Sequence, residues 1–131
     1  MPASVMIVDD HAVIRRLVRQ LLEAESLVVS DAEDGAEGIR KAEAEQPDLI
    51  ILDLSMPVMN GLEAARKLKL LLPNVPLLMF TNNVGGIVEN EARSAGISAV
   101  ISKSESGGPK QLLASVKQLL KVGEGGVPKA S

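Results

Sequence analysis

"IILDLSMPVMNG", residues 50–61, is the stretch that decides the fold of this chain. It opens with an apolar run of strand length, and the run ends at a carboxylate, Asp53. Two turn-forming dipeptides, MP and NG, follow shortly after it. A charge at the tip of a buried strand must be exposed, paired, bound to a metal or chemically reactive. The residues that end the other apolar runs decide among these four possibilities.

Five short apolar runs punctuate the chain, and their lengths suit strands better than helices. They lie at residues 5–8, 27–29, 49–52, 75–80 and 97–101. The segments between and after them have the apolar spacing of helices. These helical segments are residues 11–25, 35–46, 61–72, 84–96 and 109–121. Strands that alternate with helices predict a doubly wound α/β domain, with a parallel sheet covered by helices on both faces.

The composition limits the classes of function. The 131 residues suit one compact domain, and 46% of them are hydrophobic, which is enough for a core. The net charge of −3 gives no electrostatic footprint for nucleic acid, and no apolar stretch has the length of a membrane span. The chain has no cysteine, and Phe80 is its only aromatic residue, so thiolate metal sites and stacking platforms are not expected. We expect a cytoplasmic protein whose residues bind neither nucleic acid nor membrane directly.

The end of the chain differs in composition from the rest. The last nine residues, 123–131, read GEGGVPKAS and are rich in glycine, proline and serine. This composition is typical of a flexible tail or of a linker that is cut short. We therefore expect a single domain over residues 4–122 and a flexible C-terminal segment over 123–131.

Polar side chains follow four of the five expected strands. Ligands gather at the carboxyl ends of the strands in a parallel α/β sheet, so we expect these side chains to lie together. They are Asp9 and Asp10 after the first strand, Asp53 after the third, Thr81 after the fourth and Lys103 after the fifth.

Three carboxylates at one edge of a sheet favour a divalent cation among them, because packed carboxylates repel and raise one another's pKa. Ligands that are all oxygen atoms favour a hard cation, Mg²⁺ in particular. Lys103 is not a ligand at neutral pH, but it can pair with Asp53 or with a phosphoryl oxygen. Thr81 can donate a hydrogen bond to the same oxygen. Since a carboxylate can attack phosphorus, the interpretation is that Asp53 accepts a phosphoryl group.

Residues 4 to about 122 resemble the receiver domain of two-component response regulators. The motifs that carry the resemblance are VDDH (8–11), DGAEG (34–38), PDLIILDLSMPVMNG (47–61), LLMFT (77–81) and ISKS (101–104). The resemblance implies a flavodoxin-like fold with five helices and a five-stranded parallel sheet in the order 2-1-3-4-5.

The resemblance also implies a role for each site residue. Asp53 is the implied phosphoacceptor. Asp10 and Asp53 are the implied direct ligands of Mg²⁺, joined by the backbone carbonyl of Ser55. Asp9 is implied to hold a metal-bound water, and Lys103 to be the charge partner of the phosphoryl group.

Thr81 is the implied switch hydroxyl that moves toward the phosphoryl group. Val100 stands where the family often has an aromatic switch residue, three positions before Lys103. A valine has no ring to move between buried and exposed positions, so coupling from Thr81 would run through backbone shifts.

The implied function is a phosphorylation-activated signalling switch. The phosphodonor would be a histidine kinase or a histidine phosphotransfer protein, and the domain would catalyse its own phosphorylation and dephosphorylation without turning over an external substrate. The expected readout face spans residues 84–121. The chain's start and its KSES motif resemble regulators with a C-terminal helix-turn-helix domain, so the output lies either in an unknown partner or in a missing effector domain.

Three other functions remain open from the sequence. A Mg²⁺-dependent phosphatase with an aspartate nucleophile would have its second aspartate where this chain has Ser55. A flavin-binding protein of the same fold would need a phosphate cradle after the first strand, where this chain has two carboxylates. A receiver used only for binding is disfavoured by the complete set of site residues.

Two features of the first helical segment complete the expectations. His11 is interpreted as a residue of the first helical turn beside the acid pair, in preference to a metal ligand or a phosphoacceptor. Val13, Ile14 and Leu17 are expected to be core residues first, and candidates for kinase docking second.

Overall fold

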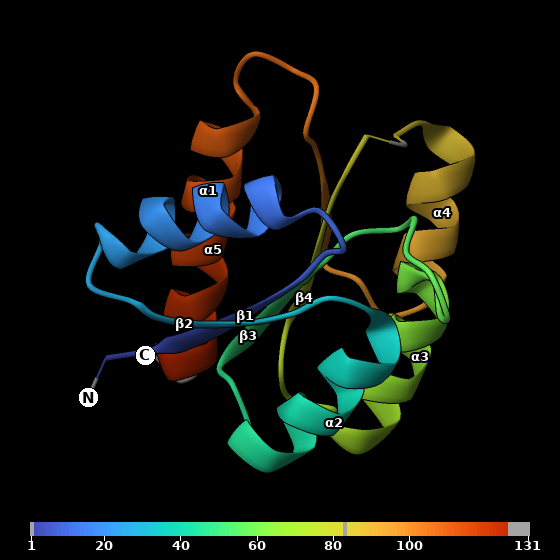
Figure 1. Cartoon of the computed structure of the whole chain (residues 1–131), viewed down its shortest axis with the longest axis horizontal. Helices are drawn as coiled ribbons and strands as arrows, with labels where there is room; N and C mark the ends of the chain where they lie inside the picture. Colours follow the sequence, from blue (N-terminus) through green and yellow to red (C-terminus); the bar gives the residue numbers. More distant parts are fainter. Residues whose placement is uncertain (1, 83, 126–131) are drawn as a thin grey trace.

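A computed structural model of the chain describes residues 2–82 and 84–125, in which strands and helices alternate (Figure 1). The strands are β1 (Ser4–Val8), β2 (Val28–Ala32), β3 (Leu49–Leu52), β4 (Leu77–Thr81) and β5 (Ala99–Ser102). The helices are α1 (Ala12–Glu23), α2 (Gly35–Glu45), α3 (Gly61–Leu71), α4 (Gly86–Ser94) and α5 (Gly108–Gly125).

The strands form one parallel sheet in the order β2-β1-β3-β4-β5, which confirms the predicted fold class and strand order. β3 is the central strand, and all four of its residues are buried. They are buried because β1 and β4 pair with its two sides and helices cover both of its faces. This is why the sequence LIIL has no polar alternation.

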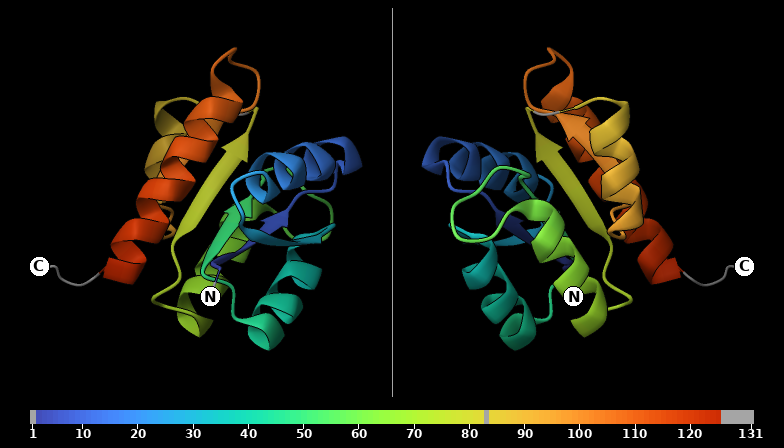
Figure 2. Two further views of the ribbon diagram at one scale, coloured as in Figure 1. Left: turned by 90° about the vertical axis from the view of Figure 1, so that its left-hand side faces the viewer. Right: turned by 90° about the vertical axis from the view of Figure 1, so that its right-hand side faces the viewer.

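Alternate residues of the strands pack into two separate cores, one on each face of the sheet. Ile50 and Leu52 face α2, α3 and α4, whereas Leu49 and Ile51 face α1 and α5. Figure 2 shows the sheet between these two layers of helices. The readout face expected from the sequence therefore includes helices from both layers, with α4 on one face and α5 on the other.

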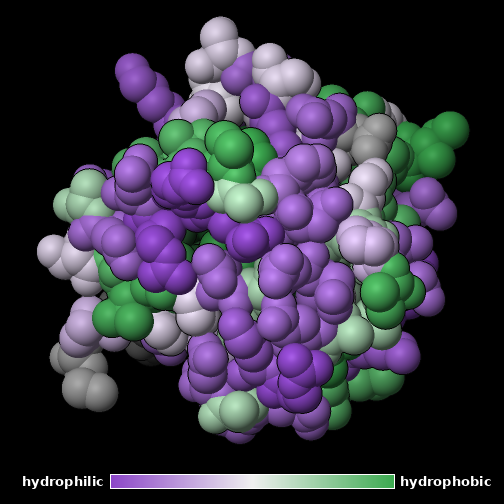
Figure 3. Space-filling view, viewed as in Figure 1, coloured by the Kyte–Doolittle hydropathy of each residue, from purple (hydrophilic) through white to green (hydrophobic). Residues whose placement is uncertain are grey.

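The helices differ in how they pack on the sheet. α5 buries Leu112, Val116 and Leu120, whereas α4 buries only the small side chain of Ala92 among its own residues. The face of the molecule in Figure 3 is mainly hydrophilic, and one of its hydrophobic patches lies over the region of α4. Ile87, in the first turn of α4, is 80% exposed.

The first helix buries less of its apolar stripe than expected. Val18 and Leu22 are buried in the core between α1 and the sheet, and Ile14 packs against that core. Val13 and Leu17 are exposed, so the expectation that they are core residues is wrong. α1 rests on the sheet along the line of Val18 and Leu22, and the residues on its flank face solvent.

The strand boundaries differ most from the prediction in β2, which begins at Val28 and continues through polar residues to Ala32. β2 is an edge strand that pairs only with β1. Long basic side chains bind its carbonyl oxygens. Arg19 donates to the Val29 carbonyl at 2.7 Å, and Lys41 donates to the Asp31 carbonyl at 2.7 Å. These contacts satisfy an exposed strand edge that the apolar pattern of the sequence does not reveal.

The last helix ends later than its sequence pattern indicates. α5 runs to Gly125 and so includes the first residues of the segment 123–131; residues 126–131 lie outside the described part of the chain. The domain boundary at residue 122 stays a prediction. Among the described residues, no helix is both long enough and apolar enough to cross a membrane.

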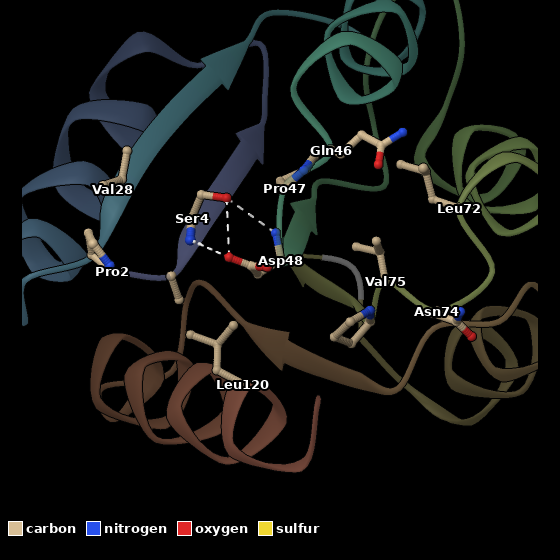
Figure 4. Close-up of a pocket in the computed structure, with 12 residues that line it drawn as sticks. Pro2, Ser4, Val28, Gln46, Pro47, Asp48, Leu72, Asn74, Val75 and Leu120 are labelled. Atoms are coloured by element: carbon tan, nitrogen blue, oxygen red, sulfur yellow. Dashed lines mark hydrogen bonds between the residues drawn. The ribbon is translucent and has the colours of Figure 1, made fainter. Parts of the chain in front are cut away.

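A groove of about 760 Å³ lies at the amino end of the sheet (Figure 4). Ser4 and Asp48 lie in it, and the Ser4 amide donates to Asp48 Oδ2 at 2.8 Å, which ties the start of β1 to the start of β3. Val28, Val75 and Leu120 contribute apolar lining. The groove is at the opposite end of the strands from Asp9 and Asp53.

The loop after β3 is held by the start of α3. Asn60 is the N-cap of α3, and its side-chain oxygen accepts hydrogen bonds from the Leu62 and Glu63 amides at 2.9 and 3.0 Å. The Gly61 amide donates to the Leu54 carbonyl at 2.8 Å. A Cβ added to Gly61 would collide with the backbone carbonyl of Asp53. The glycine is therefore required by the close approach of α3 to the residue that follows β3.

We expect Gly61→Ala to lower the free energy of unfolding by about 1–3 kcal/mol, because the methyl group forces the backbone at Asp53 to move. The control is Gly86→Ala, since a Cβ there meets nothing within 4 Å and lies in a helix. The control should change stability little, or raise it by up to about 1 kcal/mol. Urea denaturation of both variants checks this, and equal effects would contradict it.

Candidate functional site

The carboxyl ends of four strands bring the predicted site residues together. Asp9 directly follows β1, and Asp53 directly follows β3. Thr81 is the last residue of β4, and Lys103 directly follows β5. Because the strands are parallel and adjacent, all four residues lie at one edge of the sheet, as the sequence predicts.

Lys103 is the buried cation of this cluster. Its Nζ lies 2.6 Å from Asp9 Oδ2 and 3.3 Å from Asp53 Oδ2, and its side chain is only 6% exposed. The sequence analysis paired Lys103 with Asp53, whereas the structure places it closer to Asp9. A single ammonium therefore faces two buried carboxylates, and it does not balance their charge.

Asp9 is the most buried acid of the cluster, with no exposed surface. Its Oδ1 accepts hydrogen bonds from the His11 amide and faces His11 Nδ1, each at 2.9 Å. Its Oδ2 has no hydrogen-bond partner among the described residues. The contact of Oδ2 with Lys103 is close but lacks hydrogen-bond geometry, so it is an electrostatic contact only. A buried oxygen in this state has unused capacity for a further positive partner.

Asp53 sits in an environment that disfavours its charge. Burial raises the pKa of the Asp53 carboxyl above its ordinary value, and the Asp9 carboxylate raises it further. The Lys103 ammonium and hydrogen bonds from Thr81 and Lys103 lower this pKa without cancelling the rise. An additional cation at the cluster would favour the ionised form of Asp53.

His11 is a member of the cluster that the sequence analysis did not assign to the site. It is the N-cap residue of α1, and its Nδ1 lies 3.2 Å from Asp10 Oδ1 as well as beside Asp9. Ligand atoms of Asp9, Asp10, His11 and Asp53 all lie within 4.8 Å of one another. The motif VDDH contained the signal, because a residue directly after a strand-end acid pair shares the edge of the sheet with it.

Arg15 supports the site from one turn into α1. Its guanidinium donates to the Asp9 backbone carbonyl at 2.7 Å, and it lies 3.8 Å from the Asp31 carboxylate of β2. Arg15 therefore fixes the loop between β1 and α1 against β2. No sequence pattern predicts this contact, because it depends on how α1 lies across the sheet.

The remaining predicted residues lie around the cluster. Thr81 is buried beside Asp53, and Ser55 is exposed in the loop after β3. Val100 lies in β5, opposite Met79 of β4, and packs against the core on the α4 side of the sheet. Val100 therefore lies on the strand that pairs with the Thr81 strand, and it packs against the same core as α4.

The donor set fits a hard divalent cation. Asp9, Asp10 and Asp53 contribute carboxylate oxygens, and Asp10 is partly exposed, so the cluster is accessible from solvent. Burial and the neighbouring Asp9 charge together raise the pKa of Asp53, and one Asp9 oxygen has no hydrogen-bond partner among the described residues, so the cluster has room for a further positive charge. A small hard cation such as Mg²⁺ supplies this charge and takes oxygen ligands.

Comparison with known proteins identifies the family. The family model of the response regulator receiver domain matches residues 5–117. The nitrate/nitrite response regulator protein NarL of Escherichia coli (strain K12) is 47% identical over 70 residues, which are 52% of this chain and 32% of NarL. The response regulator protein VraR of Staphylococcus saprophyticus is 35% identical over 108 residues, which are 81% of this chain and 52% of VraR. The chain thus spans about half or less of the length of these relatives.

Solved structures agree with this result. The CheY-like receiver domain protein of Methanospirillum hungatei JF-1 has a TM-score of 0.90 at 30% identity, covering 97% of this chain and 100% of that one. The chemotaxis protein CheY4 of Vibrio cholerae has a TM-score of 0.84 at 30% identity, covering 91% of this chain and 99% of CheY4. The chain therefore belongs to the family of response regulator receiver domains, the phosphorylation-activated switches of two-component signalling.

Proposed function

We propose that Asp53 is the residue that accepts the phosphoryl group. The observation that carries the proposal is the buried Asp53 carboxylate with the Lys103 ammonium 3.3 Å away, at the solvent-accessible edge of the sheet. In the transfer, an Asp53 oxygen forms a bond to phosphorus as the donor's phosphorus–nitrogen bond breaks and the leaving nitrogen takes a proton. Lys103 then shifts from balancing carboxylates to balancing the added phosphoryl charge.

The acid cluster is the proposed site of Mg²⁺, with Asp10, Asp53 and the backbone carbonyl of Ser55 as direct ligands. When bound, the cation neutralises the negative charge between phosphoryl and carboxylate oxygens. Asp9 would hold a cation-bound water, and its burial and its contact with Lys103 hold its carboxyl group in a fixed place. Arg15, through the Asp9 carbonyl, holds the loop that carries both acids.

The proposed switch begins at Thr81, whose hydroxyl would donate to a phosphoryl oxygen. Such a step shifts the conformational equilibrium only by the difference in interaction between the two arrangements. Val100 packs between the neighbouring strand and the α4 side of the sheet, so it is placed to pass a backbone shift toward α4. The proposed readout face is residues 84–121, where Val84 and Ile87 are exposed.

The proposed partners follow from the same surfaces. A histidine kinase or a histidine phosphotransfer protein would supply the phosphoryl group, and the exposed Val13 and Leu17 of α1 offer it apolar contacts beside the site. The span of half or less of the curated relatives supports a longer regulator, in which residues 4–122 are the receiver and an effector domain follows. The segment 123–131 would then begin the linker.

The first test is the intact mass of the protein after incubation with Mg²⁺ and a small phosphoramidate. We expect the wild type to gain one phosphoryl group only when Mg²⁺ is present, and Asp53→Asn to gain none. Asp34→Asn is the matched control, because asparagine caps α2 as well as aspartate does and the chemical change is the same. A phosphoryl group on Asp53→Asn would show that another residue is the acceptor.

The second test concerns the buried ion pairs of Lys103. We expect Lys103→Met to lower the free energy of unfolding by about 3 kcal/mol or more, because it leaves two buried carboxylates without their cation. Lys117→Met is the control: its ion pair with Glu25, at 2.7 Å, is exposed and should contribute less than about 1 kcal/mol. Urea denaturation in metal-free buffer measures the stability of both variants. A small loss of stability in Lys103→Met would contradict a stabilising role for its two buried ion pairs.

The third test uses the raised pKa of Asp53. The native state binds the Asp53 proton more tightly than the unfolded state does, so ionisation of Asp53 destabilises the fold as pH rises from its ordinary pKa of 3.8 through the raised native pKa. We expect Asp53→Asn to be more stable than wild type above that window and equal to it below. Denaturation at a series of pH values without divalent cations measures this. A variant that is less stable at neutral pH would contradict the charge deficit.

A further inference from the structure

The imidazole of His11 lies inside the acid cluster. Its Nδ1 is 2.9 Å from Asp9 Oδ1, 3.2 Å from Asp10 Oδ1 and 4.0 Å from Asp53 Oδ2. The side chain serves no helix-capping function, since α1 receives no side-chain cap from His11. The ring is thus placed against three carboxylates by the chain itself, and the stability of α1 does not account for its position.

The distances from His11 Nδ1 to the neighbouring carboxylates are compatible with ligands that share one six-coordinate cation. With bonds of about 2.1 Å, ligand atoms at adjacent corners of an octahedron are about 3.0 Å apart, and those at opposite corners about 4.2 Å apart. Nδ1 lies near the adjacent-corner distance from the Asp10 oxygen and near the opposite-corner distance from the Asp53 oxygen, and these two carboxylates are the proposed direct ligands. His11 Nδ1 is therefore close enough to Asp10 and Asp53 to share one cation with them.

The contacts of Asp9 allow His11 to change its role. Without a cation, Nδ1 and Asp9 Oδ1 are at hydrogen-bond distance. The same Oδ1 also accepts the His11 backbone amide at 2.9 Å, so Asp9 keeps a donor when Nδ1 turns its lone pair to a metal. Asp9 Oδ2 is independent evidence for a cation at this cluster. It is fully buried and has no hydrogen-bond partner among the described residues.

We propose that His11 makes this a mixed nitrogen and oxygen site, which binds a first-row transition dication such as Ni²⁺ with the His11 imidazole as a ligand. Carboxylates alone suit Mg²⁺, whereas an imidazole selects for transition ions, whose affinity for nitrogen is higher. The proposal rests on the proposed function only in placing a cation at this cluster. It adds that the identity of the bound metal depends on a residue next to the acid pair.

The composition of the chain makes the test specific. His11 is its only histidine, and it has no cysteine. Protein with a histidine-free tag, or with no tag, therefore has one imidazole and no thiolate. A nitrogen hyperfine coupling to bound Mn²⁺, measured by pulsed electron paramagnetic resonance, would report on His11.

The experiment compares wild type with His11→Asn by calorimetric titration with Ni²⁺ and with Mg²⁺ at neutral pH. Asparagine is a good N-cap residue and can still bond to Asp9, but it lacks the imidazole nitrogen. We expect the variant to bind Ni²⁺ at least about tenfold more weakly and Mg²⁺ within about twofold of wild type. The nitrogen coupling to Mn²⁺ should be present in wild type and absent in His11→Asn.

Three outcomes would overturn the proposal. Equal losses for both metals would make His11 a positioning residue. A gain in affinity for both would make it a competitor for the site. No change in either, with Mg²⁺ still bound, would leave the proposed function standing without this ligand. If neither metal binds the wild type, the cation site of the proposed function fails as well.

Discussion

The contact on which the site depends is that of one buried ammonium, Lys103, with two buried carboxylates, Asp9 and Asp53. It joins the carboxyl ends of β1, β3 and β5, so it links strands from β1 to the far edge of the sheet. The charges in this contact are unbalanced. Burial and the Asp9 carboxylate raise the pKa of Asp53 more than Lys103 and Thr81 lower it. The site is therefore an electrostatically incomplete structure, and positive ligands or a redistribution of charge complete it.

The sheet makes this imbalance tolerable. All four residues of β3 are buried, and the close approach of Gly61 to the Asp53 carbonyl positions the backbone of Asp53. Arg15 holds the Asp9 carbonyl from α1, and His11 contacts both acids of the pair. Backbone packing and polar contacts from α1 thus act together with Lys103 to hold these carboxylates close to one another.

The sequence was sufficient for the fold and for most of the site, for a physical reason. Strand ends in a parallel sheet share one edge, so Asp9, Asp53, Thr81 and Lys103 could be brought together from topology alone. The side-chain contacts that depend on the angle of α1 could not. The Arg15 contact and the exposure of Leu17 follow from how α1 lies across the sheet. The closeness of Lys103 to Asp9 depends on the side-chain conformation of Lys103, which strand order does not predict.

The predicted boundaries of the edge strand β2 were wrong for a related reason. Its polar half reads as a loop, because Arg19 and Lys41, which bind its carbonyl oxygens, lie in the two flanking helices and not in the strand itself. Apolar periodicity detects burial, and it does not detect a strand whose edge is satisfied by side chains from other elements.

The shallow packing of α4 sets how much free energy its displacement from the sheet would cost. Its own buried residue is an alanine, and burying a methyl group stabilises far less than burying a leucine or valine of the kind that anchors α5. The two helices also belong to different cores, so α4 does not share the core that contains Leu112 and Val116. Moving α4 off the sheet would therefore expose less apolar surface than moving α5, and it would cost correspondingly less free energy.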